Sequence, residues 1–343
     1  MGSALPLARA AFLFLCLVPA GVAAQNPDTA IPAAVCDLLA AHPFDPDRIG
    51  PGVVSWDMDH ERALPACEAA VAAEPDNVRL AFQFGRTLER AQRYDEARAQ
   101  FQRAADRGHV PAMSSLALML LYRENPSLTD LPVALALLRR AVDAGFVSAI
   151  MAYGDILREG RGVARDDAAA VAQYRRAAEM GNPLAQMRLA AALIAGRGVT
   201  ADEAEAERLL RLAVAQNWVG AFADYAAFLL ERNRDLPAAE RLARRALAAN
   251  PESGLYSHIL ASVLLRAGRS AEALVYARYA AERAPDEAVA HERLGDALQA
   301  TGDNAAAAEA WRRALELAGD AAMRGRLEQR LRAAPAAPPA PGK

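Results

Sequence analysis

Lysine and aromatic residues are scarce in this sequence, and neither sign of charge forms a cluster. The chain of 343 residues is 53% hydrophobic but only 6% aromatic, and Lys343 is its single lysine. Lys+Arg number 39 against 42 Asp+Glu, for a net charge of −3, and the two signs are mixed along the chain. A nucleic-acid-binding face needs clustered basic residues that displace counterions. The composition therefore argues against nucleic acid as a partner and favours a helical protein with small side chains at its helix contacts.

Long apolar runs are absent beyond the N-terminus. The run Ala10–Val18 follows Arg9, and Val22 and Ala24 supply the small residues of a cleavage site. The run is too short to cross a bilayer, which takes about 20 apolar residues. The pattern predicts a signal peptide at 1–24, cleaved after Ala24. It also predicts an exported chain without membrane insertion of the mature part, periplasmic if the host is a Gram-negative bacterium.

Cysteine is also scarce, with three in the chain. Cys16 lies in the predicted signal peptide, and Leu15 before it is too large for the usual lipoprotein cleavage pattern, so a lipid anchor is not expected. Cys36 and Cys67 remain, and two cysteines permit one intramolecular pairing. In an oxidising compartment we favour a disulfide between them that stabilises the N-terminal end, and two buried free thiols are the alternative.

A helical repeat runs along the chain. Its mark is a triplet at offsets of zero, four and seven, in which the first and last residues are alanine. These offsets fall on one face of a helix, so each triplet indicates a buried stripe. The triplets begin 33 to 37 residues apart and are Ala63/Cys67/Ala70, Ala97/Phe101/Ala104, Ala134/Leu138/Ala141, Ala170/Tyr174/Ala177, Ala206/Leu210/Ala213, Ala239/Ala243/Ala246, Ala273/Ala277/Ala280 and Ala307/Trp311/Ala314.

A small residue precedes each triplet after the first. Small side chains let a neighbouring helix approach closely, so each unit is expected to be a pair of antiparallel helices. Neither helix can bury its stripe alone, whereas stacked pairs form a continuous core. The sequence thus predicts an all-α fold, a right-handed α-solenoid of about eight helix pairs whose N-terminal pair is degenerate in its first helix. The small residues are Gly85, Ala117, Gly154, Ala190, Ala226, Ala261 and Gly295.

Two related repeat families share these features. Leu294–Leu317, with the sequence LGDALQATGDNAAAAEAWRRALEL, closely resembles a tetratricopeptide repeat. The central units resemble Sel-one-like repeats, which carry a Gly-x-Gly-Val loop, a Tyr-Arg-Arg-Ala-Ala helix and a Gly-Asn pair. Gly160–Val163, Tyr174–Ala178 and Gly181-Asn182 supply all three. The resemblance implies an α-solenoid that binds other proteins.

The repeats and their flanks divide the chain. We expect a signal peptide at 1–24, a degenerate helix pair with a long internal loop at 25–76, the solenoid at 77–332 and a disordered Pro/Ala-rich tail at 333–343. Within the solenoid, 77–111 is tetratricopeptide-like, 112–219 Sel-one-like, 220–320 tetratricopeptide-like and 321–332 a terminal capping helix.

The Gly-Arg-Gly-Val loops do not match a phosphate-binding loop. The loop at 160–163 has no lysine, no third glycine and no preceding strand. Its glycines are expected to supply backbone conformations that other residues avoid, where the preceding helix ends. Asp166 is expected to cap the following helix, and Thr200 with Glu203 to form a capping box after the second loop.

Motifs for metal binding and catalysis are incomplete. His60-Glu61 and His291-Glu292 begin like the zinc-protease pattern His-Glu-x-x-His, but Leu64 and Gly295 stand where the second histidine is needed. No Gly-x-Ser-x-Gly elbow is present. We therefore expect no catalytic residue, no metal site and no cofactor.

The concave surface of the predicted solenoid is the candidate binding surface. Side chains three before, one after and four after the small residues are expected to face this groove. They are Phe82, Arg86, Glu89, Met151, Asp155, Arg158, Met187, His258, Glu292 and Asp296. Methionine and phenylalanine beside charged residues suit an extended segment of a protein partner.

Two functions follow from these observations. The favoured one is a non-catalytic exported scaffold or adaptor that binds a protein or peptide. The alternative, implied by exported Sel-one-like proteins, is a peptidoglycan- or polysaccharide-associated protein with weak β-lactam-binding or hydrolase activity. Relatives that bind β-lactams join every helix pair by a disulfide, whereas this chain offers one cysteine pair.

Overall fold

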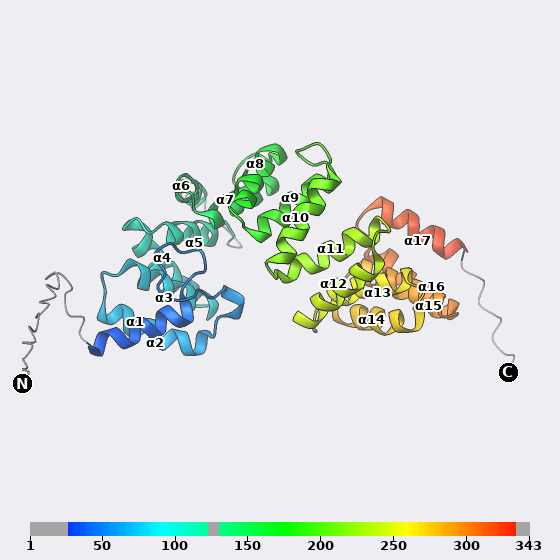
Figure 1. Cartoon of the computed structure of the whole chain (residues 1–343), viewed down its shortest axis with the longest axis horizontal. Coiled ribbons are helices and arrows are strands. Elements are labelled where there is room, and N and C mark those ends of the chain that lie inside the picture. Colours follow the sequence, from blue (N-terminus) through cyan, green and yellow to red (C-terminus); the bar gives the residue numbers. More distant parts are fainter. Residues whose placement is uncertain (1–26, 123–129, 334–343) are drawn as a thin grey trace, which may run out of the picture. The chain divides into compact units, whose positions relative to one another are not determined.

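The computed structural model describes residues 27–122 and 130–333, and within these ranges every regular element is helical (Figure 1). The predicted all-α repeat fold is confirmed. The predicted signal peptide at 1–24 lies outside the described residues, and so does the predicted tail at 333–343 except for Ala333, which is the last residue of a helix rather than disordered. The helices are α1 (Pro27–Ala40), the 3-10 turn η1 (Ser55–Asp57), α2 (His60–Ala73), α3 (Val78–Arg90), α4 (Tyr94–Asp106), α5 (Val110–Leu121), α6 (Asp130–Asp143), α7 (Val147–Glu159), α8 (Asp167–Glu179), α9 (Pro183–Ala195), α10 (Glu203–Ala215), α11 (Val219–Glu231), α12 (Leu236–Ala249), α13 (Gly254–Arg266), α14 (Ser270–Arg283), α15 (Ala288–Ala300), α16 (Asn304–Leu317) and α17 (Ala321–Ala333).

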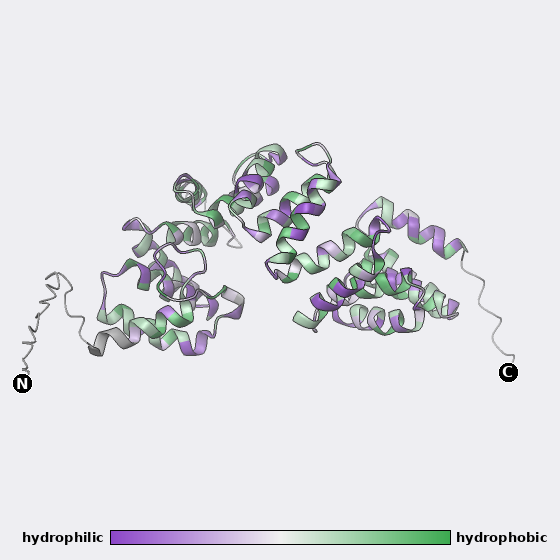
Figure 2. Ribbon diagram, in the orientation of Figure 1, coloured by the Kyte–Doolittle hydropathy of each residue, from purple (hydrophilic) through white to green (hydrophobic). Residues whose placement is uncertain are grey.

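The alanine triplets form the core of the repeats. All members of the eight triplets are at most 2% exposed, including Tyr174 and Trp311. They lie on the even-numbered helices from α2 to α16. The opposite faces of these helices carry charged residues, so hydrophobic and hydrophilic residues alternate along them in Figure 2. Burying each such stripe against the preceding helix is the main favourable term for a repeat of this kind.

Glycine replaces alanine at the small-residue position wherever the facing side chain is aromatic. A Cβ atom at Gly85 would lie 2.6 Å from the ring of Phe101, and one at Gly154 would lie 2.6 Å from Tyr174. At Gly295 it would overlap the indole of Trp311. The two helices of these repeats therefore approach so closely that no larger residue fits, which is the packing that the spacing predicts.

The chain divides into two compact units, and the first extends to Ala112. In this unit α1 packs against α2 and α3, and α3 packs against α4. Cys36 of α1 and Cys67 of α2 form a disulfide with Cα atoms 4.7 Å apart, which confirms the favoured pairing. Both cysteines are fully buried. The disulfide encloses the long connection between α1 and α2, which contains η1.

The second unit begins at Met113, within α5, and contains the helices from α6 to α17. The pairs α7/α8, α9/α10, α11/α12, α13/α14 and α15/α16 pack directly, and each even-numbered helix from α8 to α14 also packs on the next odd-numbered one. Contacts between α9 and α11, α11 and α13, and α13 and α15 connect the first helices of successive pairs. These first helices therefore share one surface, and α17 covers α16 at the C-terminal end.

The Gly-Arg-Gly-Val loops join helices, as expected. Gly160 and Gly196 end α7 and α9 with φ of 70° and 63°, in the left-handed region that favours glycine. A Cβ atom at Gly162 would lie 3.4 Å from Leu131 and 3.8 Å from Leu121, so the first loop lies against apolar side chains. An open phosphate cradle does not have this arrangement.

One helix cap was predicted correctly and one was wrong. The Asp166 carboxylate accepts a hydrogen bond from the Ala169 N–H at 2.9 Å and caps α8. The capping box of Thr200 and Glu203 does not form. Helix α10 begins at Glu203 with Asp202 as its cap, because the Asp202 carboxylate lies directly before the helix and accepts a hydrogen bond from the Glu205 N–H at 3.0 Å.

Candidate functional site

The two aspartates predicted to line the groove are oriented by aromatic side chains of their own repeats. The Tyr174 hydroxyl donates to Oδ1 of Asp155 at 2.8 Å, and the Trp311 indole N–H donates to Oδ1 of Asp296 at 3.1 Å. Both aromatic residues are buried triplet members. The buried core of each repeat therefore fixes a carboxylate on the surface formed by the first helices.

Both carboxylates form ion pairs, and that of Asp155 joins two neighbouring first helices. Asp155 of α7 lies 3.3 Å from Nε of Arg188 on α9, and it also pairs with Arg158 at 3.4 Å. Asp296 of α15 pairs with Arg293 at 2.8 Å. Burial raises the pKa of Asp296, and the arginines around it oppose that rise. Both aspartates are therefore committed to partners within the chain.

In the first unit the inner face of α3 is covered by the chain itself. Phe82 is fully buried, and its ring lies 5.8 Å from Phe101 and 4.8 Å from His109, measured between centroids. Arg86 is 3% exposed and donates to the carbonyl oxygens of Ala40 at 2.5 Å and Val53 at 2.6 Å. These two residues were predicted to face a partner, but residues 40–55 occupy that place.

The covering segment is tightly fitted. The Val53 N–H donates to the Ala41 carbonyl at 2.7 Å, which holds the two ends of the loop together. A Cβ atom at Gly50 would overlap the backbone of Asp37, and Gly52 has a φ of 85°. Burial raises the pKa of Glu89, the remaining candidate on α3, although Arg86 lowers it. The segment therefore packs on α3 as part of the first unit.

At the other end of the chain, α17 covers the candidates on α15. Glu292 is 4% exposed and pairs with Arg330, while Arg326 lies 3.6 Å from the same carboxylate. Arg330 also pairs with Asp296 at 3.1 Å. Helix α17 is mainly hydrophilic (Figure 2) and carries these arginines toward α15. The acidic pair on α15 is therefore neutralised within the chain.

The candidates on α7, α9 and α13 remain accessible to solvent. Met151, Arg158, Met187 and His258 are all partly exposed. The pKa of His258 is lowered to about 4 by burial and by Arg293, so its imidazole is neutral at physiological pH. The open part of the predicted surface thus lies in the second unit, on helices that are not covered by non-repeating segments.

Two charged residues of this open surface were missed from the sequence. Arg188 and Asp224 lie two residues before the small residues Ala190 and Ala226. They were missed because only the positions three before, one after and four after each small residue were expected to face the groove. Both are exposed. A charged residue in these alanine-rich first helices was the signal that could have identified them.

A hollow of about 440 Å³ lies where α11, α13 and α15 adjoin. Leu230 and Leu265 form its apolar part, and Arg266, Arg293 and Asp296 line its polar part. It opens on the same surface as the accessible candidates, and its mixed lining suits a side chain of a bound protein segment.

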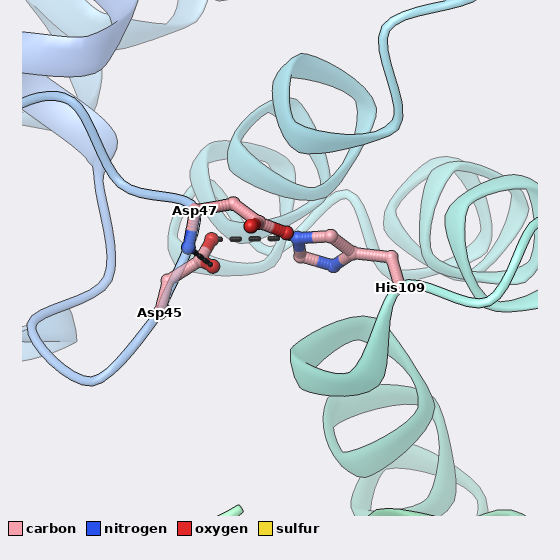
Figure 3. A group of neighbouring side chains, drawn as sticks. All are labelled: Asp45, Asp47 and His109. Atoms are coloured by element: carbon pink, nitrogen blue, oxygen red, sulfur yellow. Dashed lines mark hydrogen bonds and ion pairs between the residues drawn. The ribbon is translucent and has the colours of Figure 1, made fainter.

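Asp45, Asp47 and His109 form the one group of possible metal ligands among residues 27–122 and 130–333 (Figure 3). Nε2 of His109 lies 3.4 Å from the buried Oδ2 of Asp45. However, Nδ1 of His109 accepts a hydrogen bond from the Ala112 N–H at 3.3 Å, which assigns the ring proton to Nε2. A nitrogen that carries a proton cannot ligate a metal. The arrangement favours a structural His–Asp pair that connects the α1–α2 loop to the start of α5.

Two segments of the chain match sequence models of known families. Residues 58–119 and 226–288 each match a model described as tetratricopeptide repeat. Among curated proteins, none is similar enough in sequence to match. No helix in the described ranges is both long and apolar enough to cross a membrane.

Solved structures share the fold. The crystal structure of a Sel1 repeat protein from Oxalobacter formigenes has a TM-score of 0.53 and 22% sequence identity, and covers 73% of this chain and 98% of that one. The structure of c5321, a protective antigen of uropathogenic Escherichia coli with an SLR fold, has a TM-score of 0.37 and 19% identity, and covers 83% of this chain and 77% of that one. Two segments of the chain thus match tetratricopeptide-repeat models, and its helical repeat fold is similar to that of the Sel1 repeat protein from Oxalobacter formigenes.

Proposed function

We propose that the protein is a non-catalytic, exported scaffold that binds an extended segment of a partner protein on the first helices of its second unit. Repeats of this type form protein-interaction scaffolds. The binding surface runs over α7, α9, α11 and α13. Export rests on the signal-peptide pattern at 1–24, and a disulfide between Cys36 and Cys67 is compatible with an oxidising compartment.

One observation carries this proposal. The first helices near both ends of the chain are covered by non-repeating parts of the same chain, namely residues 40–55 over α3 and α17 over α15. The helices between them present methionine, arginine, aspartate and histidine side chains to solvent. Such a mixture of apolar and charged groups is suited to an extended protein segment.

The alternative, a cell-wall-associated protein with weak β-lactam-binding or hydrolase activity, has less support. It was suggested by relatives in which every helix pair carries a disulfide, whereas the three cysteines of this chain permit one intramolecular pair after signal cleavage. Turnover of a chromogenic β-lactam by the purified protein above the buffer rate would favour it over the scaffold.

The proposal is tested by site-specific photo-crosslinking in the native host. A photoreactive residue replaces Met187 on the open surface, and in the control it replaces Val275, which is 65% exposed on α14 outside that surface. We expect discrete adducts to a partner from position 187 and none from position 275. Adducts of equal yield from both positions, or from position 275 alone, would contradict binding on the first helices.

Export is tested separately by the N-terminal sequence of the protein isolated from its host. We expect the mature chain to begin at Gln25. A chain that retains Met1 and is recovered with cytoplasmic markers would remove export from the proposal and would leave the binding surface untouched.

A further inference from the structure

Helix α17 is held on the second unit by few apolar contacts. Leu327 is the one buried residue among its 13, and it joins the apolar cluster around Trp311, with Met323 and Leu331 packed against that cluster in part. Gly325 lies inside the helix, where an added Cβ would meet no atom within 4 Å, and a glycine there weakens a helix relative to alanine. A helix of this length is marginal by itself. Its place on the second unit therefore depends strongly on its polar contacts.

These polar contacts converge on two carboxylates of α15. The Arg330 guanidinium donates to Oε1 of Glu292, and its Nε and Nη2 each lie 3.1 Å from one oxygen of Asp296. Arg326 lies 3.6 Å from the Glu292 carboxylate. The side chain of Glu292 is 5% exposed and that of Asp296 is 14% exposed. A guanidinium that bridges two nearly buried carboxylates, one of them through two nitrogens, is bound by the geometry that suits arginine best.

Contacts outside α17 also hold the Asp296 carboxylate in place. The Trp311 indole N–H donates to its Oδ1 at 3.1 Å, and Arg293 of the same helix lies 2.8 Å from its Oδ2. Glu292 is one helical turn before Asp296 on the same face. The two acids and Arg293 together carry a net charge of −1, so the site keeps an excess of negative charge when Arg330 leaves it.

The acidic pair adjoins the open surface. Asp296 and Arg293 line the hollow of about 440 Å³ where α11, α13 and α15 meet, and α15 packs on α13. A partner segment that lies along α11 and α13 therefore reaches α17 at the next helix of the row. The open surface ends there only because Arg330 and Arg326 occupy the carboxylates of α15.

We propose that Glu292 and Asp296 form a binding site for an arginine side chain of the partner segment, and that α17 closes this site in the free protein through Arg330. An arginine of the partner replaces Arg330, α17 leaves α15, and the bound surface extends by one helix. Because α17 is tethered, it competes at an effective concentration of about 1 mM, so it is displaced by a partner that is also held on α7 to α13. The inference rests on the proposed function, since it specifies what that same partner presents to α15.

The test uses the full-length mature protein and two synthetic peptides. One peptide has the sequence of residues 320–333, and the other carries the change Arg330→Gln. Binding of each labelled peptide is measured by fluorescence anisotropy with the native chain and with two variants, Arg330→Gln and Arg332→Gln. Arg332 is the matched control, because it is exposed in the last turn of α17 and forms no ion pair within the described residues.

We expect the unchanged peptide to bind Arg330→Gln about tenfold more tightly than it binds the native chain or Arg332→Gln, because only the first variant opens the site. The peptide with Arg330→Gln should bind that variant about tenfold more weakly than the unchanged peptide, because it lacks the charge-assisted hydrogen bonds. Equal binding of the two peptides, equal binding to the two variants, or no binding to either would overturn the inference.

Hydrogen exchange with mass spectrometry distinguishes a displaceable helix from a structural cap. In Arg330→Gln we expect the amides of α17 to exchange about tenfold faster, while those of α13 to α16 keep their native rates. Unchanged exchange in α17, or an equal loss of protection in α15 and α16, would overturn the inference. Adducts from position 187 would in that case leave the scaffold proposal standing, and their absence would remove the scaffold whatever the peptides do.

Discussion

The disulfide between Cys36 and Cys67 is expected to supply a large part of the stability of the first unit. It joins residues separated by 31 positions. Closing a loop of this length in the unfolded chain stabilises the folded state by about 3.7 kcal/mol through lost chain entropy. Small domains have total stabilities of about 5–15 kcal/mol, so reduction removes a substantial fraction.

The perturbation is reduction of the native chain, because both sulfur atoms stay in place and the packing of two fully buried side chains is kept. Oxidised and reduced protein are unfolded in guanidinium chloride, and hydrogen exchange with mass spectrometry follows peptides from α1 to α4 separately from those of α11 to α14. We expect the first set to lose about 3–4 kcal/mol of protection and the second set to remain unchanged.

The reasoning is tested by where in the chain reduction of the disulfide lowers the protection against hydrogen exchange. The enclosed segment 40–55 is held on α3 by Arg86, so its amides should show the largest increase in exchange on reduction. Equal protection of α1 to α4 in the two redox states would refute the reasoning. An equal loss in α11 to α14 would show that the two units do not unfold separately.

Three further predictions follow from single contacts. The pKa of His42 is lowered to about 3 by burial and by Arg86. The stability that comes from burying its neutral imidazole is therefore fully present above about pH 6.5 and is lost as the pH falls toward 3. His42→Asn should therefore reduce the difference in free energy of unfolding between pH 7 and pH 5 by about 2 kcal/mol, and an unchanged difference would exclude a buried neutral imidazole. Gly295→Ala should destabilise its repeat by about 1–3 kcal/mol through overlap with Trp311, and a double-mutant cycle with Trp311→Leu should recover most of this loss. Asp202→Ala should lower the free energy of unfolding by about 1 kcal/mol in thermal unfolding, whereas Thr200→Ala should lower it by less than about 0.5 kcal/mol. A larger loss for Thr200→Ala would indicate that Thr200 caps the helix instead.

The position of the helices and the core could be predicted because each repeat is determined locally. Residues four and seven apart on one helix must share a face, so the triplets predicted which side chains are buried. The aromatic residues at positions 101, 174 and 311 and the glycines that face them carry the same information, since a close helix contact requires a small residue opposite a large one. The number of cysteines limited the pairing to Cys36 with Cys67, and the expected oxidising compartment favoured the disulfide over two free thiols.

The extent of the open surface could not be predicted in the same way. The repeat register places Phe82, Arg86 and Glu292 on the first helices. It does not indicate which segments of the chain cover them. Arg86 is covered by residues more than 30 positions earlier, and Glu292 by Arg330, 38 positions later. Neither contact leaves a periodic trace in the sequence.

The all-α repeat, its buried stripes and the glycine turns depend on contacts within one repeat or between adjacent helices, so they could be predicted from the order of the residues alone. Which first helices stay uncovered depends instead on the tertiary structure. The physical reason is that non-repeating segments fold back over distant helices, and their contacts depend on shape and charge in three dimensions.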